Sequence, residues 1–136
     1  MKKRKKNNRG FTLVELLVVI VILIAIVSIA IPSITSSMER SKEKLNEGKK
    51  ETIGTAAELY LNTTNRSALK GFYNGECIVL LDRLVSGDYI DEDDIMNADN
   101  KPFADGNPAI CKGCIDDEKY SIFDANESGG YTLCDG

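Results

Sequence analysis

The sequence contains no histidine and no tryptophan, and only three of its 136 residues are proline. Histidine is the commonest general acid or base in enzymes, and its absence excludes the Ser/His and Cys/His pairs of nucleophilic catalysis. A glycine-rich phosphate loop is absent as well. We therefore expect neither enzymatic activity nor a cofactor.

A long hydrophobic run lies near the amino terminus. Residues 11–31 contain only three polar side chains, Thr12, Glu15 and Ser28. As an α-helix this run is about 31 Å long, which matches a bilayer core of about 30 Å. Six basic residues and no acidic one precede it. We therefore expect the leader to stay in the cytoplasm and the C-terminus to face outward.

Glu15 is the informative residue of this run, because a carboxylate in hydrocarbon is costly unless a partner neutralises it. It follows Gly10-Phe11-Thr12-Leu13-Val14 after a basic leader, and Pro32 closes the run. This pattern resembles the type III signal of type IV pilins and pseudopilins. The resemblance implies cleavage after Gly10 by a prepilin peptidase, methylation of the new amino terminus at Phe11, and neutralisation of that amine by Glu15 of a neighbouring subunit.

Two other interpretations of the N-terminal segment remain open. An ordinary secretory signal has a small-x-small cleavage site in Ser28-Ile29-Ala30, although a disposable signal gains nothing from a buried acid. A permanent membrane anchor is compatible with the hydropathy alone. The interpretations differ in where the mature protein begins.

The formal net charge of −4 hides an asymmetry along the chain. Without the leader, 11 basic residues remain against 21 acidic ones, and from residue 62 onward there are six against 15. An anionic domain repels the phosphate backbone, so we expect no direct binding of nucleic acid.

The N-terminal helix is expected to continue past Pro32, because a membrane helix tolerates proline as a kink. Beyond it, apolar residues recur at helical spacing among charged ones. These positions are Ile34, Met38, Leu45, Ile53, Ala56, Ala57 and Tyr60. We predict one helix over 11–61, transmembrane over 11–31 and amphipathic over 32–61, with Gly48 and Gly54 as weak points.

Residues 62–136 are predicted to form one small extracellular head. Residues 76–85 fit a buried strand or a short helix, and the spacing of the leucines favours the helix. Residues 91–118 are rich in Asp, Asn, Gly and Pro, which is typical of a loop. The alternating segments 119–123 and 131–134 predict a β-hairpin. The expected fold class is α+β and pilin-like: a long N-terminal helix, half of it transmembrane, packed on a head with a short antiparallel sheet.

Four cysteines, Cys77, Cys111, Cys114 and Cys134, lie in the predicted extracellular part, where disulfides persist. We expect two disulfides, and the sequence does not select among the three possible pairings. A bridge from Cys114 to Cys134 resembles the disulfide-bounded loop near the C-terminus of many pilins, and a bridge from Cys77 would hold the C-terminal strand equally well. A Cys₄ zinc site and redox activity of the C-x-x-C motif are the alternatives.

The acidic residues after position 90 include four candidate calcium ligands, Asp91, Asp93, Asp94 and Asp99. Calcium is bound by C-terminal loops of some secretion pseudopilins, but the spacing here matches no EF-hand. We favour a solvated acidic surface and predict no metal site.

The resemblance implies a structural subunit of a type IV pilus or pilus-like filament that serves adhesion, motility or surface interaction. The subunit would form a homo- or hetero-polymer with other pilins at an inner-membrane assembly platform. It would lie in the cytoplasmic membrane before assembly and in an extracellular filament afterwards. The alternatives are a competence or type II secretion pseudopilin and, from another class, an exported or membrane-anchored binding domain stabilised by disulfides.

Overall fold

The computed structural model describes residues 10–115, 117–127 and 129–135. Of the predicted leader, residues 1–10, only Gly10 is therefore among the described residues, and Asp116 of the acidic segment is outside them. The chain divides into two compact units, Met1–Glu39 and Arg40–Gly136.

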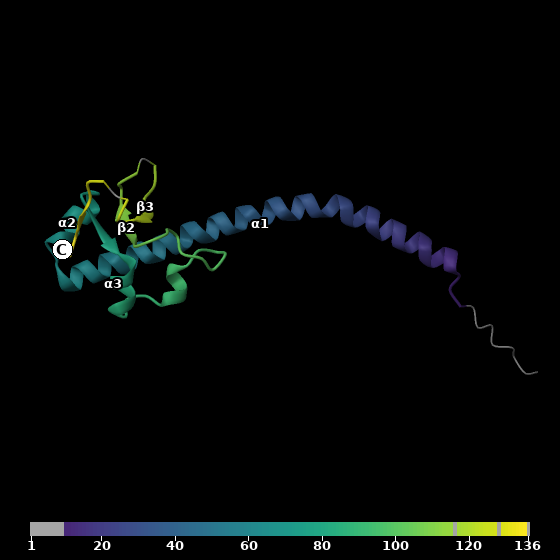
Figure 1. The fold of residues 1–136 in the computed structure, drawn as a ribbon, viewed down its shortest axis with the longest axis horizontal. Coiled ribbons are helices and arrows are strands. Elements are labelled where there is room, and N and C mark those ends of the chain that lie inside the picture. Colours follow the sequence, from purple (N-terminus) through teal and green to yellow (C-terminus); the bar gives the residue numbers. More distant parts are fainter. Residues whose placement is uncertain (1–9, 116, 128, 136) are drawn as a thin grey trace, which may run out of the picture. The chain divides into compact units, whose positions relative to one another are not determined.

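Helix α1 (Leu13–Thr64) begins in the first unit and ends in the second (Figure 1). Its assignment is continuous through Pro32, which has no N–H to donate to the carbonyl of Ser28. Four hydroxyls near Pro32 bond back to carbonyls of the preceding turn, from Ser28 to Ile24, Ser33 to Ala30, Thr35 to Ile31 and Ser36 to Ser33. These bonds satisfy the hydroxyls within an apolar segment. The kink at Pro32 stays a prediction.

The second unit is an α+β domain built on the C-terminal part of α1. After α1 come α2 (Ala68–Tyr73), β1 (Cys77–Leu80), α3 (Leu81–Ser86), the 3₁₀ helix η1 (Glu92–Ile95), β2 (Pro108–Lys112), β3 (Tyr120–Asp124) and β4 (Thr132–Leu133). The strands form one sheet in the order β3-β2-β1-β4. The long helix with a small domain confirms the expected fold class, but the sheet is mixed, because β4 runs parallel to β1.

One face of α1 supplies the centre of the core. Its buried residues are Ile53, Gly54, Ala56, Ala57, Tyr60 and Leu61. They form one cluster with side chains from the sheet and α3, including Val79, Ile110 and Leu84. The predicted apolar face is thus buried at Ile53, Ala56, Ala57 and Tyr60. It is exposed at Ile34, Met38 and Leu45, where 51–56% of each side chain is accessible.

The segment 76–85 is half strand and half helix, so the preference for a helix was wrong for its first part. β1 is buried on both faces: Cys77 and Val79 face the cluster on α1, and Ile78 belongs to a second cluster with Ala109 and Cys111. A strand buried on both faces has no polar alternation, which removes the usual sequence signal for a strand.

The predicted hairpin of 119–123 with 131–134 does not exist. β3 pairs antiparallel with β2, and β4 lies at the opposite edge of the sheet beside β1. β2 lies within residues 91–118, which were predicted to be a loop. Its five residues begin with proline and are flanked by turn-forming residues, so local composition concealed them.

Polar side chains of α1 hold the acidic segment that follows α3. The Lys49 ammonium donates to the carbonyl oxygens of Asp93 at 3.3 Å and Met96 at 2.9 Å. The Asn46 side-chain oxygen accepts the backbone N–H of Ala98 at 2.7 Å. A loop with few apolar residues is thereby ordered by the helix on which it lies.

Gly54 lets the ring of Tyr120 contact the helix backbone, so we expect Gly54→Ala to destabilise the head. A Cβ at this position would lie 2.4 Å from the ring, which is itself buried and bonded to Glu58. Overpacking of this kind costs about 1–3 kcal/mol, more than the higher helix propensity of alanine returns. Gly48→Ala is the matched control, since no atom lies within 4 Å there. Thermal unfolding of both variants checks this, and equal melting temperatures would contradict it.

Candidate processing and assembly site

The predicted cleavage site lies just outside the start of α1. Gly10, Phe11 and Thr12 are not helical, and Phe11 is 88% exposed. No heavy atom lies within 4 Å of the position that a Cβ on Gly10 would occupy. The peptide bond predicted to be cut is thus sterically open within the first unit.

Thr12 is the N-cap of α1. Its hydroxyl oxygen accepts the backbone N–H of Glu15 at 3.2 Å, and its carbonyl accepts the N–H of Leu16 at 3.1 Å. The sequence prediction missed this role, although Thr-x-x-Glu is the pattern of a capping box. The cap explains why the helix begins at Leu13 and not at Phe11.

Glu15 lies in the first turn of α1 and is exposed. A carboxylate there interacts favourably with the positive end of the helix dipole. Cleavage after Gly10 would add an ammonium group at Phe11, four residues before Glu15. Processing would thus create a positive group four residues before this negative one in the sequence, and the assembly role of Glu15 stays a prediction.

The apolar part of α1 has no partner within the described chain. The large apolar side chains from Leu13 to Ile31 are about half exposed or more, and none of the most apolar stretch is buried. By length and composition this helix is able to cross a membrane. Burying such a surface requires lipid or other protein chains.

In the second unit, a polar cluster joins α1 to the sheet around Glu58. Its carboxylate accepts Lys112 at 2.7 Å, the Tyr120 hydroxyl at 2.6 Å and the Tyr73 hydroxyl at 3.2 Å. The Lys112 ammonium also lies 4.2 Å from the centre of the Tyr73 ring. Burial alone would raise the pKa of Glu58, but the bonds from Lys112 and Tyr120 together hold it below its ordinary value. Burial and the bond to Glu58 raise the pKa of Tyr120.

The Glu58 cluster predicts a pH-dependent stability. Because the pKa of Glu58 is lower in the folded state, its contribution is complete above its ordinary pKa of 4.5 and is lost as the pH falls through the folded-state pKa. We expect Glu58→Gln to cost about 1–2 kcal/mol at pH 7 and less at pH 3. Chemical denaturation at both pH values measures this. Glu51→Gln, which breaks the exposed pair with Lys119, should change little, and an equal loss there would contradict the assignment.

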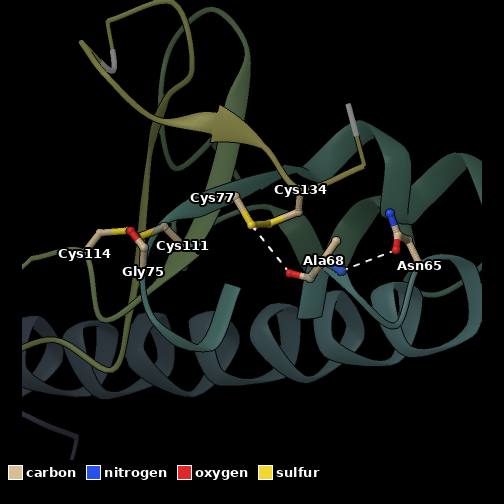
Figure 2. Close-up of a disulfide and its surroundings, with 7 residues drawn as sticks. All are labelled: Asn65, Ala68, Gly75, Cys77, Cys111, Cys114 and Cys134. Carbon is tan, nitrogen blue, oxygen red and sulfur yellow. Dashed lines mark hydrogen bonds between the residues drawn. A yellow bond between two sulfur atoms is a disulfide. The ribbon is translucent and has the colours of Figure 1, made fainter. Parts of the chain in front are cut away.

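The four cysteines form two disulfides, Cys77–Cys134 and Cys111–Cys114 (Figure 2). The structure thus differs from the Cys114–Cys134 bridge that the resemblance suggested. The first bridge joins β1 to the residue after β4, where the N–H of Cys134 also donates to the Ile78 carbonyl at 2.9 Å. The second closes a four-residue turn at the end of β2, beside the carbonyl of Gly75.

Among the described residues, the candidate metal ligands form no cluster, and one of them, Asp99, is paired with a lysine. Within the described ranges, no group of three or more His, Cys, Asp or Glu side chains is placed to hold a metal ion. Asp99 forms an ion pair with Lys42, and this bond lowers the pKa of Asp99. In the same loop, the backbone carbonyls of Asp93 and Met96 accept hydrogen bonds from the ammonium of Lys49.

The N-terminal region matches a known family model. The prokaryotic N-terminal methylation motif covers residues 5–31, and this motif is the signature of type IV pilins and prepilins. It is a structural motif rather than that of an enzyme family. It implies processing by a prepilin peptidase, association with a membrane and polymerisation. Comparisons with curated proteins and with solved structures returned no match.

Proposed function

We propose, from the type IV pilin signature at residues 5–31, that this chain is the precursor of a structural subunit of a pilus or pilus-like filament. A prepilin peptidase removes residues 1–10 and methylates Phe11, and the mature subunit then polymerises outside the cytoplasmic membrane. The observation that carries the proposal is the methylation motif continued by an uncovered apolar helix with Glu15 in its first turn.

Both stages of this life cycle bury the same surface. Before assembly the helix from Leu13 to Ile31 lies in the bilayer with the head outside, as the six basic residues of the leader favour. In the filament the helices pack against one another. Moving from lipid to protein gains little hydrophobic free energy, so packing and the pairing of Glu15 with the amine of Phe11 must fix the register.

The head forms the outer surface of the filament. Beyond residue 61 it carries 15 acidic and six basic residues, so it presents a negative surface to water and to neighbouring cells. Pilus pilins and pseudopilins share every feature used here. We therefore propose a filament subunit without choosing between these classes. It would polymerise with copies of itself or with other pilins at an inner-membrane assembly platform.

Processing tests the proposal directly. In cells with an active prepilin peptidase we expect the mature chain to begin with N-methylated Phe11 and to lack residues 1–10. Intact mass and N-terminal peptide analysis measure this, with cells lacking the peptidase as the control. A mature chain that begins at Ile31, or that retains Met1 despite the peptidase, would rule out the pilin assignment in favour of a secretory signal or a permanent anchor.

A further inference from the structure

We propose that Thr12 is a positioning residue for leader removal, a proposal that rests on the processing function above. By capping the N-terminus of α1, its hydroxyl makes the helix begin after the bond to be cut. The Gly10–Phe11 peptide is thereby kept in a non-helical form that a peptidase can bind.

The cap redirects one specific hydrogen bond. In a helix that began a turn earlier, the N–H of Glu15 would donate to the carbonyl of Phe11. Here the Thr12 hydroxyl accepts it at 3.2 Å, and the first helical bond runs from Leu16 to the Thr12 carbonyl at 3.1 Å. Gly10 and Phe11 therefore stay outside the helix, as the structure shows.

The chemistry of cleavage requires this exposure. Water adds to the carbonyl carbon of Gly10, the bond to the Phe11 nitrogen breaks, and the leaving nitrogen takes up a proton to become the new amine. In a helix the Gly10 carbonyl would accept the N–H of Val14, and neighbouring turns would crowd the carbon that is attacked. Binding an extended peptide also requires free main-chain donors and acceptors, which a helix has already used.

The same bond prepares the product. A new ammonium at Phe11 faces the positive end of the helix dipole, which disfavours it. Because the Thr12 hydroxyl caps through the backbone N–H of Glu15, that bond does not consume the carboxylate, which can pair with the ammonium. One side chain thus separates the two functions of the first turn, capping and charge neutralisation.

Four variants of the full-length precursor test the proposal in membranes that contain prepilin peptidase. Thr12→Ser and Thr12→Asn retain an N-cap, whereas Thr12→Ala and Thr12→Val remove it, and valine keeps the shape of threonine. We expect the first pair to be processed within about twofold of the wild-type rate and the second pair about fivefold more slowly. Intact mass against time gives the rates, and carbonate extraction checks that all variants insert.

A second measurement separates positioning from a direct contact with the peptidase. With ¹³C at the Gly10 carbonyl of the precursor in micelles, the chemical shift should move toward the helical value in Thr12→Ala and stay unchanged in Thr12→Ser. The proposal would be overturned if the alanine and valine variants were both cut at the wild-type rate. It would also be overturned if only the valine variant were cut normally, because the shape of residue 12 and not its capping hydroxyl would then matter. If the wild-type chain itself is not cut after Gly10, the proposed function fails, and this inference fails with it.

Discussion

Glu15→Ala is expected to abolish filaments or reduce them sharply while leaving the precursor expressed, inserted and cleaved. The carboxylate lies in the first turn of α1, and in the proposed filament it pairs with the ammonium at Phe11 of a neighbouring subunit. In a low-dielectric filament core an unpaired ammonium costs several kcal/mol, and this penalty recurs at every subunit. Insertion should not suffer, because an apolar side chain replaces an acid in the apolar run.

Matched variants make this prediction sharp. Glu15→Gln keeps the shape and loses the charge, so it should also fail to assemble. Glu39→Ala removes an exposed acid from the same helix beyond the apolar run and should assemble normally. Sheared filament yield by immunoblot, with membrane-bound subunit as the reference, measures all three. Wild-type yield from Glu15→Ala would contradict the pairing.

The second large effect is expected from the bridge between Cys77 and Cys134. It joins residues 57 apart, whereas Cys111 and Cys114 are three apart. In the chain-entropy model the two bridges contribute about 4 and about 2 kcal/mol, because the longer loop restricts the unfolded chain more. For a domain of this size, losing the first should lower the melting temperature by about 15–30 °C.

Serine pairs test the two bridges separately. Cys77→Ser with Cys134→Ser should show the large loss, and Cys111→Ser with Cys114→Ser a clearly smaller one. Thermal unfolding of the exported head, with and without reductant, gives both values. If the short bridge proves the more important, or if reductant changes neither melting temperature, the entropic account of this head is wrong.

Features encoded by neighbouring residues could be predicted from the sequence. The apolar run, the acid at position 15 and the Gly-Phe junction lie within one short segment, and that segment matches the methylation motif. The helix boundaries were predicted within three residues, with an observed start at Leu13 and an observed end at Thr64. Even the Thr12 cap had a local signal in its spacing to Glu15.

Features that depend on distant residues could not be predicted in the same way. β4 pairs with β1, whose Cys77 forms the disulfide with Cys134, 57 residues later in the chain. The order of the acidic loop depends on Lys49 and Asn46 of α1, whose polar side chains look like ordinary surface residues in the sequence. Gly54 was predicted as a weak point of the helix, and its contact with Tyr120 becomes visible only in the folded head.

The bridge from Cys77 to Cys134 also determines what happens when the head is cut. It encloses nearly everything after α2, including the long connections between β-strands. A protease that cleaves once inside this ring cannot release a fragment, because both new ends stay covalently joined. The C-terminal end is also bound to α1, because the Tyr60 hydroxyl donates to the carboxylate of Asp135 at 2.7 Å, and this carboxylate is almost buried. If the head lies outside the cell, as proposed, a single cut in one of its loops would leave it in one covalently joined piece.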